Sequence, residues 1–264
     1  SLISTSEQTK WITVKDCQVL DPISKITGSR RYSYKMEGQL HLVQDCYARN
    51  GRHDYVVGTY RSSGTVFLDC TSVSIHASNE PHHRYSTGIL YDNVQHLNAN
   101  TILVLGLWNR LNFGSGHGWA AANSVLWNCS APNVGITCEK PPLAQNYAIG
   151  CNSASMSSAM RWGPFPGLKN NFVPGDAHWE HWNAGPVTPQ SLYRAQLQDR
   201  QAPPVPTIPP ERVDFNTDSK VDFSDFLLFI RGFSNADLTC DLDEDGKVGF
   251  SDFLQFARAF QAAH

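Results

Sequence analysis

Short apolar runs that alternate with polar residues recur along the first 150 residues of the chain. Four of them end in a similar phrase with a cysteine, and a fifth, "ILYDN", fits the same template with Asn93 in the cysteine position. These positions are Cys17, Cys46, Cys70, Asn93 and Cys129, at intervals of 29, 24, 23 and 36 residues. Each interval holds one or two short β-branched runs bounded by Gly, Asn, Asp or Ser. Irregular intervals of this size predict the coils of a parallel β-helix with loops of variable length.

An antiparallel sandwich is the main alternative, but it needs frequent hairpin turns. Only Asn50-Gly51 provides such a turn signal.

Cysteine behaves as a small apolar residue, and copies of it at the ends of successive strands can stack in a narrow core. We therefore expect a buried ladder at the four cysteine phrases and no disulfide framework there. Seven cysteines are an odd number, and the pair most readily connected is Cys138 with Cys151, which bracket a Pro-rich loop.

The composition narrows the range of partners and locations. The chain is rich in Gly, Pro, Asn, Ser and Trp, and only 17% of its residues are charged, which is typical of all-β extracellular domains. A formal net charge of −3 provides no basic field for nucleic acid. No apolar run approaches the length that spans a bilayer. We therefore expect a secreted protein with no nucleic-acid partner and no membrane span.

A family resemblance rests on the phrases "VKDC", "VQDC" and "FLDC", with "GRHDYVVG" and "NFGSGHGWAAANSVLWNC". From residue 12 to about residue 160 the chain resembles secreted right-handed parallel β-helix proteins of the pectate-lyase-like kind. The resemblance implies a mainly β fold of that type. Such families include polysaccharide lyases, glycoside hydrolases, epimerases and non-catalytic binding or fibre proteins, so the resemblance supports the fold better than the function. It also implies that another segment or chain covers the open first coil.

The repeats then give way to a loop-like stretch with three tryptophans, which we expect to wrap along the coils as residues 160–200. The tryptophans are Trp162, Trp179 and Trp182. The stretch ends at residues 189–200, where the spacing of Leu192, Ala195 and Leu197 predicts one helix with these side chains toward the body.

A Pro-rich segment, "QAPPVPTIPP", follows this helix. Its five prolines predict a stiff, extended linker. The chain is thereby divided into a β-helix domain at 1–200, a linker at 201–211 and a small module at 212–264.

Two twelve-residue segments beyond the linker have the spacing of calcium-binding loops. They are "DFNTDSKVDFSD", 214–225, and "DLDEDGKVGFSD", 241–252, and a helical run follows each. Ca²⁺ takes six to eight oxygens, which such a loop supplies from side chains at positions 1, 3, 5, 9 and 12 and from the carbonyl at position 7. The expected ligands are Asp214, Asn216, Asp218, the Lys220 carbonyl, Asp222 and Asp225 in the first loop, and Asp241, Asp243, Asp245, the Lys247 carbonyl and Asp252 in the second.

This tandem resembles a dockerin or a similar duplicated EF-hand module over residues 212–261. The resemblance implies an all-α pair whose folding is coupled to calcium. Ser219 stands where Gly normally makes the sharp turn, so we expect a weaker first site. Phe223 and Phe250 stand where dockerins often carry polar recognition residues, which argues against a cohesin and leaves another protein partner open. The helical spacing predicts a core of Phe223, Phe226, Leu227, Ile230, Phe250, Phe253, Leu254 and Ala257.

Three successive coils each carry an arginine and at least one histidine. The candidate catalytic residues are Arg52, His53, Asp54, His82, His83, Arg84, Arg110 and His117. Adjacent parallel strands lie about 4.8 Å apart, so these groups would form a cationic, titratable strip if they share one face. Such a strip suits β-elimination or hydrolysis of an acidic polysaccharide, where a cation neutralises the carboxylate and a base removes the neighbouring proton. The expected roles are Arg84 and Arg110 for carboxylates, His83 or His53 as base, His117 as acid, Asp54 to orient His53, and Trp119 or Tyr85 to stack on a sugar.

A structural interpretation stays open beside the catalytic one. Parallel β-helices use polar ladders and turn-bound Arg and His to satisfy loop carbonyls. The chain would then be a non-catalytic glycan-binding module, or a subunit of an extracellular assembly or fibre. The motifs of serine hydrolases, zincins and zinc ribbons are absent from the sequence.

Overall fold

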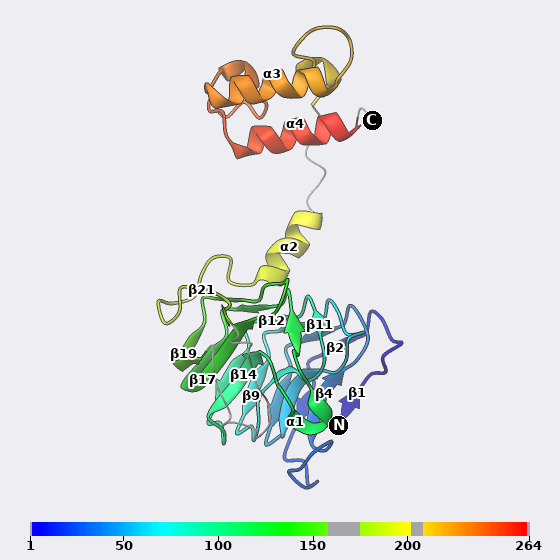
Figure 1. Ribbon diagram of the computed structural model, residues 1–264, viewed down its shortest axis with the longest axis vertical. Coiled ribbons are helices and arrows are strands. Elements are labelled where there is room, and N and C mark those ends of the chain that lie inside the picture. The colour runs from blue at the N-terminus through cyan, green and yellow to red at the C-terminus, as the bar shows by residue number, and fades with distance from the viewer. Residues whose placement is uncertain (1, 158–174, 202–207, 263–264) are drawn as a thin grey trace. The chain divides into compact units, whose positions relative to one another are not determined.

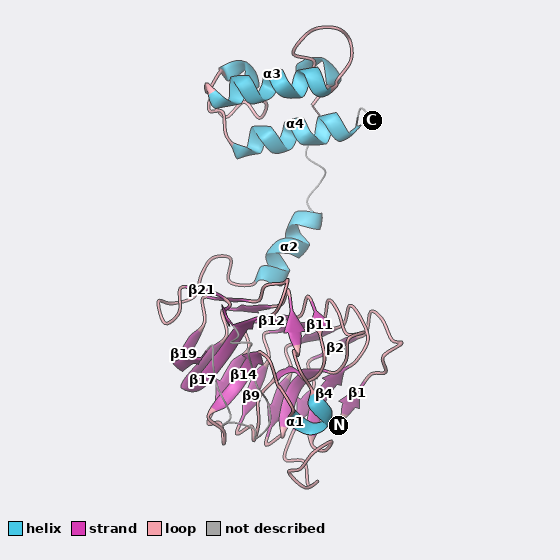
Figure 2. Cartoon of the chain, viewed as in Figure 1, coloured by secondary structure: helices cyan, strands magenta, loops and turns pink. Residues whose placement is uncertain are grey.

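The structure is a computed structural model that describes residues 2–157, 175–201 and 208–262 (Figure 1). The expected position of Trp162 and most of the Pro-rich linker therefore lie outside the described residues. The chain divides into two compact units, Ser1–Leu197 and Gln198–His264. The first unit is mainly β and the second is helical (Figure 2). None of the described helices is long and apolar enough to cross a membrane.

Three sheets of parallel strands build the first unit. The first sheet contains β1 (Ile3–Ser4), β4 (Tyr32–Met36), β7 (His53–Val57) and β10 (Glu80–Pro81). The second contains β2 (Thr13–Lys15), β5 (Leu42–Gln44), β8 (Val66–Leu68), β12 (Leu90–Asp92), β16 (Val125–Trp127), β18 (Tyr147–Ile149) and β21 (His178–Glu180). The third contains β3 (Gln18–Val19), β6 (Tyr47–Arg49), β9 (Thr71–Val73), β13 (Gln95–Leu97), β17 (Ser130–Lys140) and β14 (Leu103–Leu107), with β19 (Asn152–Ser157) beside β17.

A shorter pair, β11 (Ser86–Thr87) and β15 (Ala121–Ala122), is also parallel. The short helix α1 (Phe113–Gly116) lies in the loop between β14 and β15. The described strand pairs are parallel apart from β17 with β20 (Gly175–Asp176). The chain visits the second, third and first sheets in that order for three successive passages, each of which we call a rung. This arrangement is compatible with a β-helix-like fold, and no described strand pair forms the hairpins of a sandwich.

The repeated cysteine phrase marks a corner between the second and third sheets. The residue before each cysteine has a positive φ, as at Asp45 (51°) and Asp69 (50°), and short polar side chains tolerate this left-handed conformation. Asn93 (57°) is the equivalent of Asp69, because β12 pairs with β8 in register. The prediction that Asn93 takes the cysteine position is therefore wrong by one residue. Val94 takes it and is fully buried.

The cysteine ladder itself is confirmed. Cys46, Cys70 and Cys129 are buried free thiols, whereas Cys17, on the first rung, is only half-buried. The strand register adds Cys151 as the next member of the ladder. Cys138 and Cys151 are both free, so the expected disulfide between them is wrong. Aromatic rings stack in the same core, for example Tyr34 on Tyr55 with ring centroids 5.3 Å apart.

The end of the first unit is attached to the strands by polar contacts. The Asn128 side chain bonds to the backbone of Val187, and the Asp92 carboxylate accepts from the Ser191 hydroxyl (2.8 Å) and the Tyr193 amide (2.7 Å). These contacts hold the start of α2 (Leu192–Gln201), which lies close to the predicted helix. Leu197, expected to face the body, is exposed.

The second unit consists of η1 (Pro210–Arg212), α3 (Phe223–Ser234), η2 (Leu238–Cys240) and α4 (Phe250–Ala262). Its core is built around Phe229 and Phe256, whose rings stack at 4.6 Å. The predicted helices are present, but the predicted core is wrong at five positions. Those that are exposed are Phe223, Leu227, Phe250, Leu254 and Ala257. The neighbouring face of each helix is buried instead. Apolar residues lie on both faces of each helix, so the sequence pattern alone does not determine which face packs into the core.

Candidate functional site

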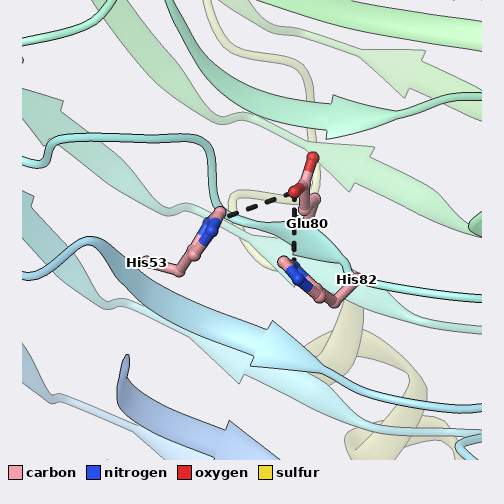
Figure 3. A group of neighbouring side chains, drawn as sticks. All are labelled: His53, Glu80 and His82. Atoms are coloured by element: carbon pink, nitrogen blue, oxygen red, sulfur yellow. Dashed lines mark ion pairs between the residues drawn. The ribbon is translucent and has the colours of Figure 1, made fainter. Parts of the chain in front are cut away.

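A buried polar cluster lies where β7 and β10 run side by side. His53 begins β7, Glu80 begins β10, and His82 follows β10. Figure 3 shows both imidazoles directed at the Glu80 carboxylate. The Nδ1 atoms of His53 and His82 are 4.0 and 3.6 Å from Glu80 Oε1. The parallel pairing of β7 with β10, in which Glu80 lies opposite Val56, brings these side chains near one another although His53 and Glu80 are 27 positions apart in sequence.

Glu80 is fully buried and is the centre of the cluster. Its Oε1 atom is 3.0 Å from Arg110 Nε. Its Oε2 atom accepts hydrogen bonds from the Ser78 hydroxyl (2.8 Å) and the Trp108 indole (2.6 Å). Arg110 is buried as well and donates to the His82 carbonyl at 2.6 Å. A buried ion pair with further hydrogen bonds holds its members firmly, and removing one member leaves an uncompensated charge.

The two histidines of this cluster are held by their own partners. His53 donates from Nδ1 to the Ser78 carbonyl, at 2.5 Å, and stacks on Tyr32 at 5.3 Å. His82 Nε2 is 3.3 Å from the Tyr32 hydroxyl. Arg52 reaches the same hydroxyl at 3.4 Å from outside. We call Tyr32, His53, Glu80, His82 and Arg110 the buried layer.

A second group of side chains lies next to the buried layer, and in it His117 is buried whereas the other two members reach solvent. The His83 and His117 rings are 5.1 Å apart, and His117 is 4.9 Å from His82. His83 is half-buried and Arg84 is exposed. We call His83, Arg84 and His117 the surface layer. Among the described residues Arg84 has no ion pair, so its charge is available to a ligand.

The electrostatics keep the imidazoles neutral. Burial, opposed in part by Glu80, lowers the pKa of His53 to about 3. Burial and Arg110 lower the pKa of His82 and bring that of His117 to about 4. Burial and nearby Lys35 also lower the pKa of His83. At neutral pH the site therefore combines neutral bases with permanent arginine cations.

A metal ion does not fit the buried layer. The ligand atoms of His53, Glu80 and His82 lie within 4.8 Å of one another, which is a spacing that a metal could use. However, Arg110 already contacts the carboxylate oxygen that would bind it, and His53 Nδ1 donates to a carbonyl. A cation there would lie beside a guanidinium in a buried setting, where like charges repel strongly.

The structure places six of the eight predicted residues in the two layers. His53, His82 and Arg110 are in the buried layer, and His83, Arg84 and His117 are in the surface layer. Arg52 lies at the border. Asp54 belongs to neither, because its oxygens accept from Ser33 and Ser72, each at 2.6 Å.

Two of the expected roles are therefore corrected. Asp54 follows His53 in a strand, so its side chain points to the opposite face and cannot orient that imidazole. Arg110 is bound to Glu80 and buried, so it is not placed to hold a substrate carboxylate. The sequence analysis missed Glu80 and Trp108. A signal for Glu80 existed, since a buried arginine needs a carboxylate and Glu80 is the acidic residue nearest to His82 and His83 in sequence.

The two loops of the second unit repeat one hydrogen-bond pattern. Asp225 accepts from the Asn216 and Asp222 amides, and Asp252 accepts from the Asp243 and Gly249 amides. The amides of Ser219 and Gly246 likewise donate to the aspartate at position 1 of their loops. Equivalent bonds 27 residues apart show that both loops fold in the same way.

The second loop fits a hard cation better than the first. Ligand oxygens of Asp241, Asp243 and Asp252 lie within 4.8 Å of one another. In addition, Asp241 Oδ1 is buried without a hydrogen-bond partner among the described residues. Carboxylates are the ligands that Ca²⁺ prefers, and an orphaned buried oxygen is a natural place for a cation. The first loop forms no such cluster within the described residues, and Ser219 adopts a φ of 68° that favours glycine.

No protein-family model, no curated protein and no solved structure matches this chain.

Proposed function

We propose that this chain is a secreted protein that acts on an acidic polysaccharide by β-elimination, on a right-handed parallel β-helix. The observation that carries the proposal is the pairing of exposed Arg84 with half-buried His83 above the buried layer. An unpaired guanidinium beside a neutral imidazole is the combination that removes a proton next to a carboxylate.

In this mechanism Arg84 binds the uronate carboxylate and neutralises the charge that develops on it. His83 takes the proton from the adjacent carbon, the bond to the glycosidic oxygen breaks, and a carbon–carbon double bond forms. The leaving oxygen receives its proton from water or from the imidazolium. His117 packs against His83 and positions it. The lowered pKa of His117 makes it a poor acid at neutral pH, so this assignment replaces the acid role predicted from sequence.

The second unit is proposed to be a calcium-stabilised, dockerin-like module. Asp241, Asp243 and Asp252 would hold the ion, with Asp245 and the Lys247 carbonyl completing the set. Calcium would supply folding energy, since removing the ion leaves several carboxylates facing one another. The module is also the proposed attachment point for a protein partner.

A non-catalytic role is the second candidate, and the burial of most of the cluster favours it. Of the eight predicted residues Arg84 alone is exposed, Arg52 and His83 are half-buried, and the other five are buried. The chain would then bind a glycan, or form part of an extracellular assembly. The first rung supports an assembly, because Trp11 and Ile23 on it are largely exposed.

The test is an assay of several uronate polymers for the unsaturated product, whose new double bond absorbs in the ultraviolet. We expect product from the wild type and a loss of about a hundredfold or more in His83→Ala. The matched control is His178→Ala, an exposed histidine on β21 outside the site. Full activity in His83→Ala would refute the mechanism, and no product from any acidic polymer would favour the non-catalytic candidate.

A further inference from the structure

Two of the three predicted arginines carry a charge that no carboxylate compensates. Arg110 is paired with Glu80, whereas neither Arg52 nor Arg84 belongs to an ion pair among the described residues. Arg110 was expected to bind a substrate carboxylate, and its burial removes it from that role. Arg84 is exposed and Arg52 is half-buried, so both guanidinium groups reach solvent. Arg52 is therefore the arginine of the site whose role is still unassigned.

A short series of contacts joins Arg52 to the surface layer. Its Nη1 atom is 3.4 Å from the Tyr32 hydroxyl, and its guanidinium carbon is 5.9 Å from the centre of the Tyr32 ring. The same hydroxyl is 3.3 Å from His82 Nε2. The His82 ring in turn lies 5.6 Å from the His83 ring and 4.9 Å from the His117 ring. His82 and Tyr32 thus connect Arg52 with the surface layer.

The electrostatics also connect the two arginines, because both charges act on one group of imidazoles. Besides burial and Arg110, Arg52 lowers the pKa of His82. Arg84 likewise adds to the effect of burial on the pKa values of His83 and His117. Neutral imidazoles leave two uncompensated positive charges at this site. Like charges repel more strongly where water is partly excluded, and a bound anion relieves that repulsion.

The two arginines stand on successive rungs. Arg52 directly precedes β7, Arg84 follows β10, and these two strands pair in parallel. Arg84 is next to His83 in sequence, whereas the contacts from Arg52 to His83 pass through Tyr32 and His82. A carboxylate held beside His83 by Arg84 is therefore separated from Arg52 by those two side chains. Arg52 is placed to meet a second carboxylate of the same ligand.

We propose that Arg52 binds the carboxylate of the sugar next to the reacting one, so that the chain recognises polymers with uronates on consecutive sugars. The proposal rests on the proposed function for the class of ligand. Polygalacturonate and alginate carry a carboxylate on every sugar, and hyaluronan carries one on every second sugar. The contact with Arg52 is the same before and during the reaction, so it lowers KM without changing kcat. Arg84 differs, because it neutralises charge that develops in the transition state.

The test is affinity electrophoresis through gels that contain polygalacturonate, alginate or hyaluronan, with a neutral dextran gel as the reference for mobility. We expect polygalacturonate or alginate to retard the wild type more than hyaluronan does. Arg52→Gln should weaken that retardation about fivefold to tenfold, and Arg52→Lys should retain most of it because the charge is kept. The matched control is Arg258→Gln, which makes the same change of charge at an exposed arginine on α4. An unfolding midpoint of Arg52→Gln equal to that of the wild type excludes misfolding.

Equal retardation of the wild type and Arg52→Gln overturns the proposal, and so does the absence of retardation by all three acidic polymers. Stronger retardation by hyaluronan than by the other two polymers also overturns it. Failure of this binding role is distinguishable from failure of the lyase chemistry. Arg52-dependent retardation without unsaturated product retains the binding role and removes the chemistry. Product formation with an unchanged KM in Arg52→Gln retains the chemistry and removes the binding role.

Discussion

The buried and surface layers contain the same residue types, yet the structure gives them different tasks. His82 and His83 are neighbours in sequence, but His82 is enclosed beside Glu80 whereas His83 is half-exposed beside Arg84. Arg110 has its charge compensated by Glu80, while the charge of Arg84 is left for a ligand. Residue type alone therefore does not identify a catalytic group here. Burial and the presence of a counter-charge make the distinction between a structural group and a catalytic one, and this distinction can be tested.

The largest expected effect comes from removing the centre of the buried layer. Glu80→Gln leaves the Arg110 charge buried without a partner, so the free energy of unfolding should fall by about 3–5 kcal/mol. Chemical denaturation of the whole chain measures this fall. The double variant Glu80→Gln/Arg110→Met should regain part of the loss, and Arg84→Ala should leave the midpoint unchanged. A stable Glu80→Gln single variant would contradict the distinction between layers.

The surface layer should control the pH dependence of activity. His83 acts in its neutral form, and burial lowers its pKa, so the neutral form persists below the ordinary value of 6.5. The acid limb of the kcat profile should therefore lie below pH 6.5. Initial rates of product formation across pH 4–8 measure it. An acid limb above pH 6.5 would show that another group is the base.

Glu139 is a buried carboxylate without a paired cation, so it can be compared with Glu80, whose charge is paired with Arg110. Burial raises the pKa of Glu139 from 4.5 to about 7, and no cation pairs with it among the described residues. The folded state therefore binds the proton more tightly, and its stability falls as pH rises from 4.5 through 7. Glu139→Gln still accepts from the Asn109 amide, so it should stabilise the chain at pH 8 by about 1–3 kcal/mol.

The measurement is the unfolding midpoint of Glu139→Gln and of the wild type at pH 8 and pH 4.5. The stabilisation should fall to about 0.5 kcal/mol or less at pH 4.5, where the folded wild type is protonated and its unfolded state is half protonated. A difference that is equal at both pH values would contradict the assignment of a raised pKa.

The smallest expected effect concerns the two loops of the second unit. Ser219→Gly relieves a left-handed residue and should tighten calcium binding at the first loop by about 1 kcal/mol. Isothermal titration with Ca²⁺ measures this change, with Asp252→Asn as the control that removes the second site. An unchanged calcium affinity of the first loop would show that Ser219 does not weaken that site.

The repeats of the chain could be predicted because their cause is local. The Asp-Cys phrase encodes a left-handed corner followed by a small buried residue, and the calcium loops encode their ligands at fixed spacing. The error at Asn93 arose because Val94 replaces cysteine on that rung, so the corner residue was mistaken for the core residue. The core of α3 and α4 was mispredicted because apolar side chains surround much of each helix.

The candidate site could be predicted only in part, since its organisation depends on register. The histidines and arginines were recognisable by type, but which of them is buried follows from strand direction and from Glu80. Asp54 illustrates the limit, because its position one residue after His53 turns it to the opposite face of the strand.

The most direct test of the account is the rate of unsaturated product formation by Arg84→Ala relative to the wild type, on one uronate polymer at neutral pH. The account predicts a loss of about a hundredfold or more with an unchanged unfolding midpoint, while Arg49→Ala, at a half-buried arginine on β6 outside both layers, retains the wild-type rate. Product formed by Arg84→Ala at the wild-type rate would contradict it.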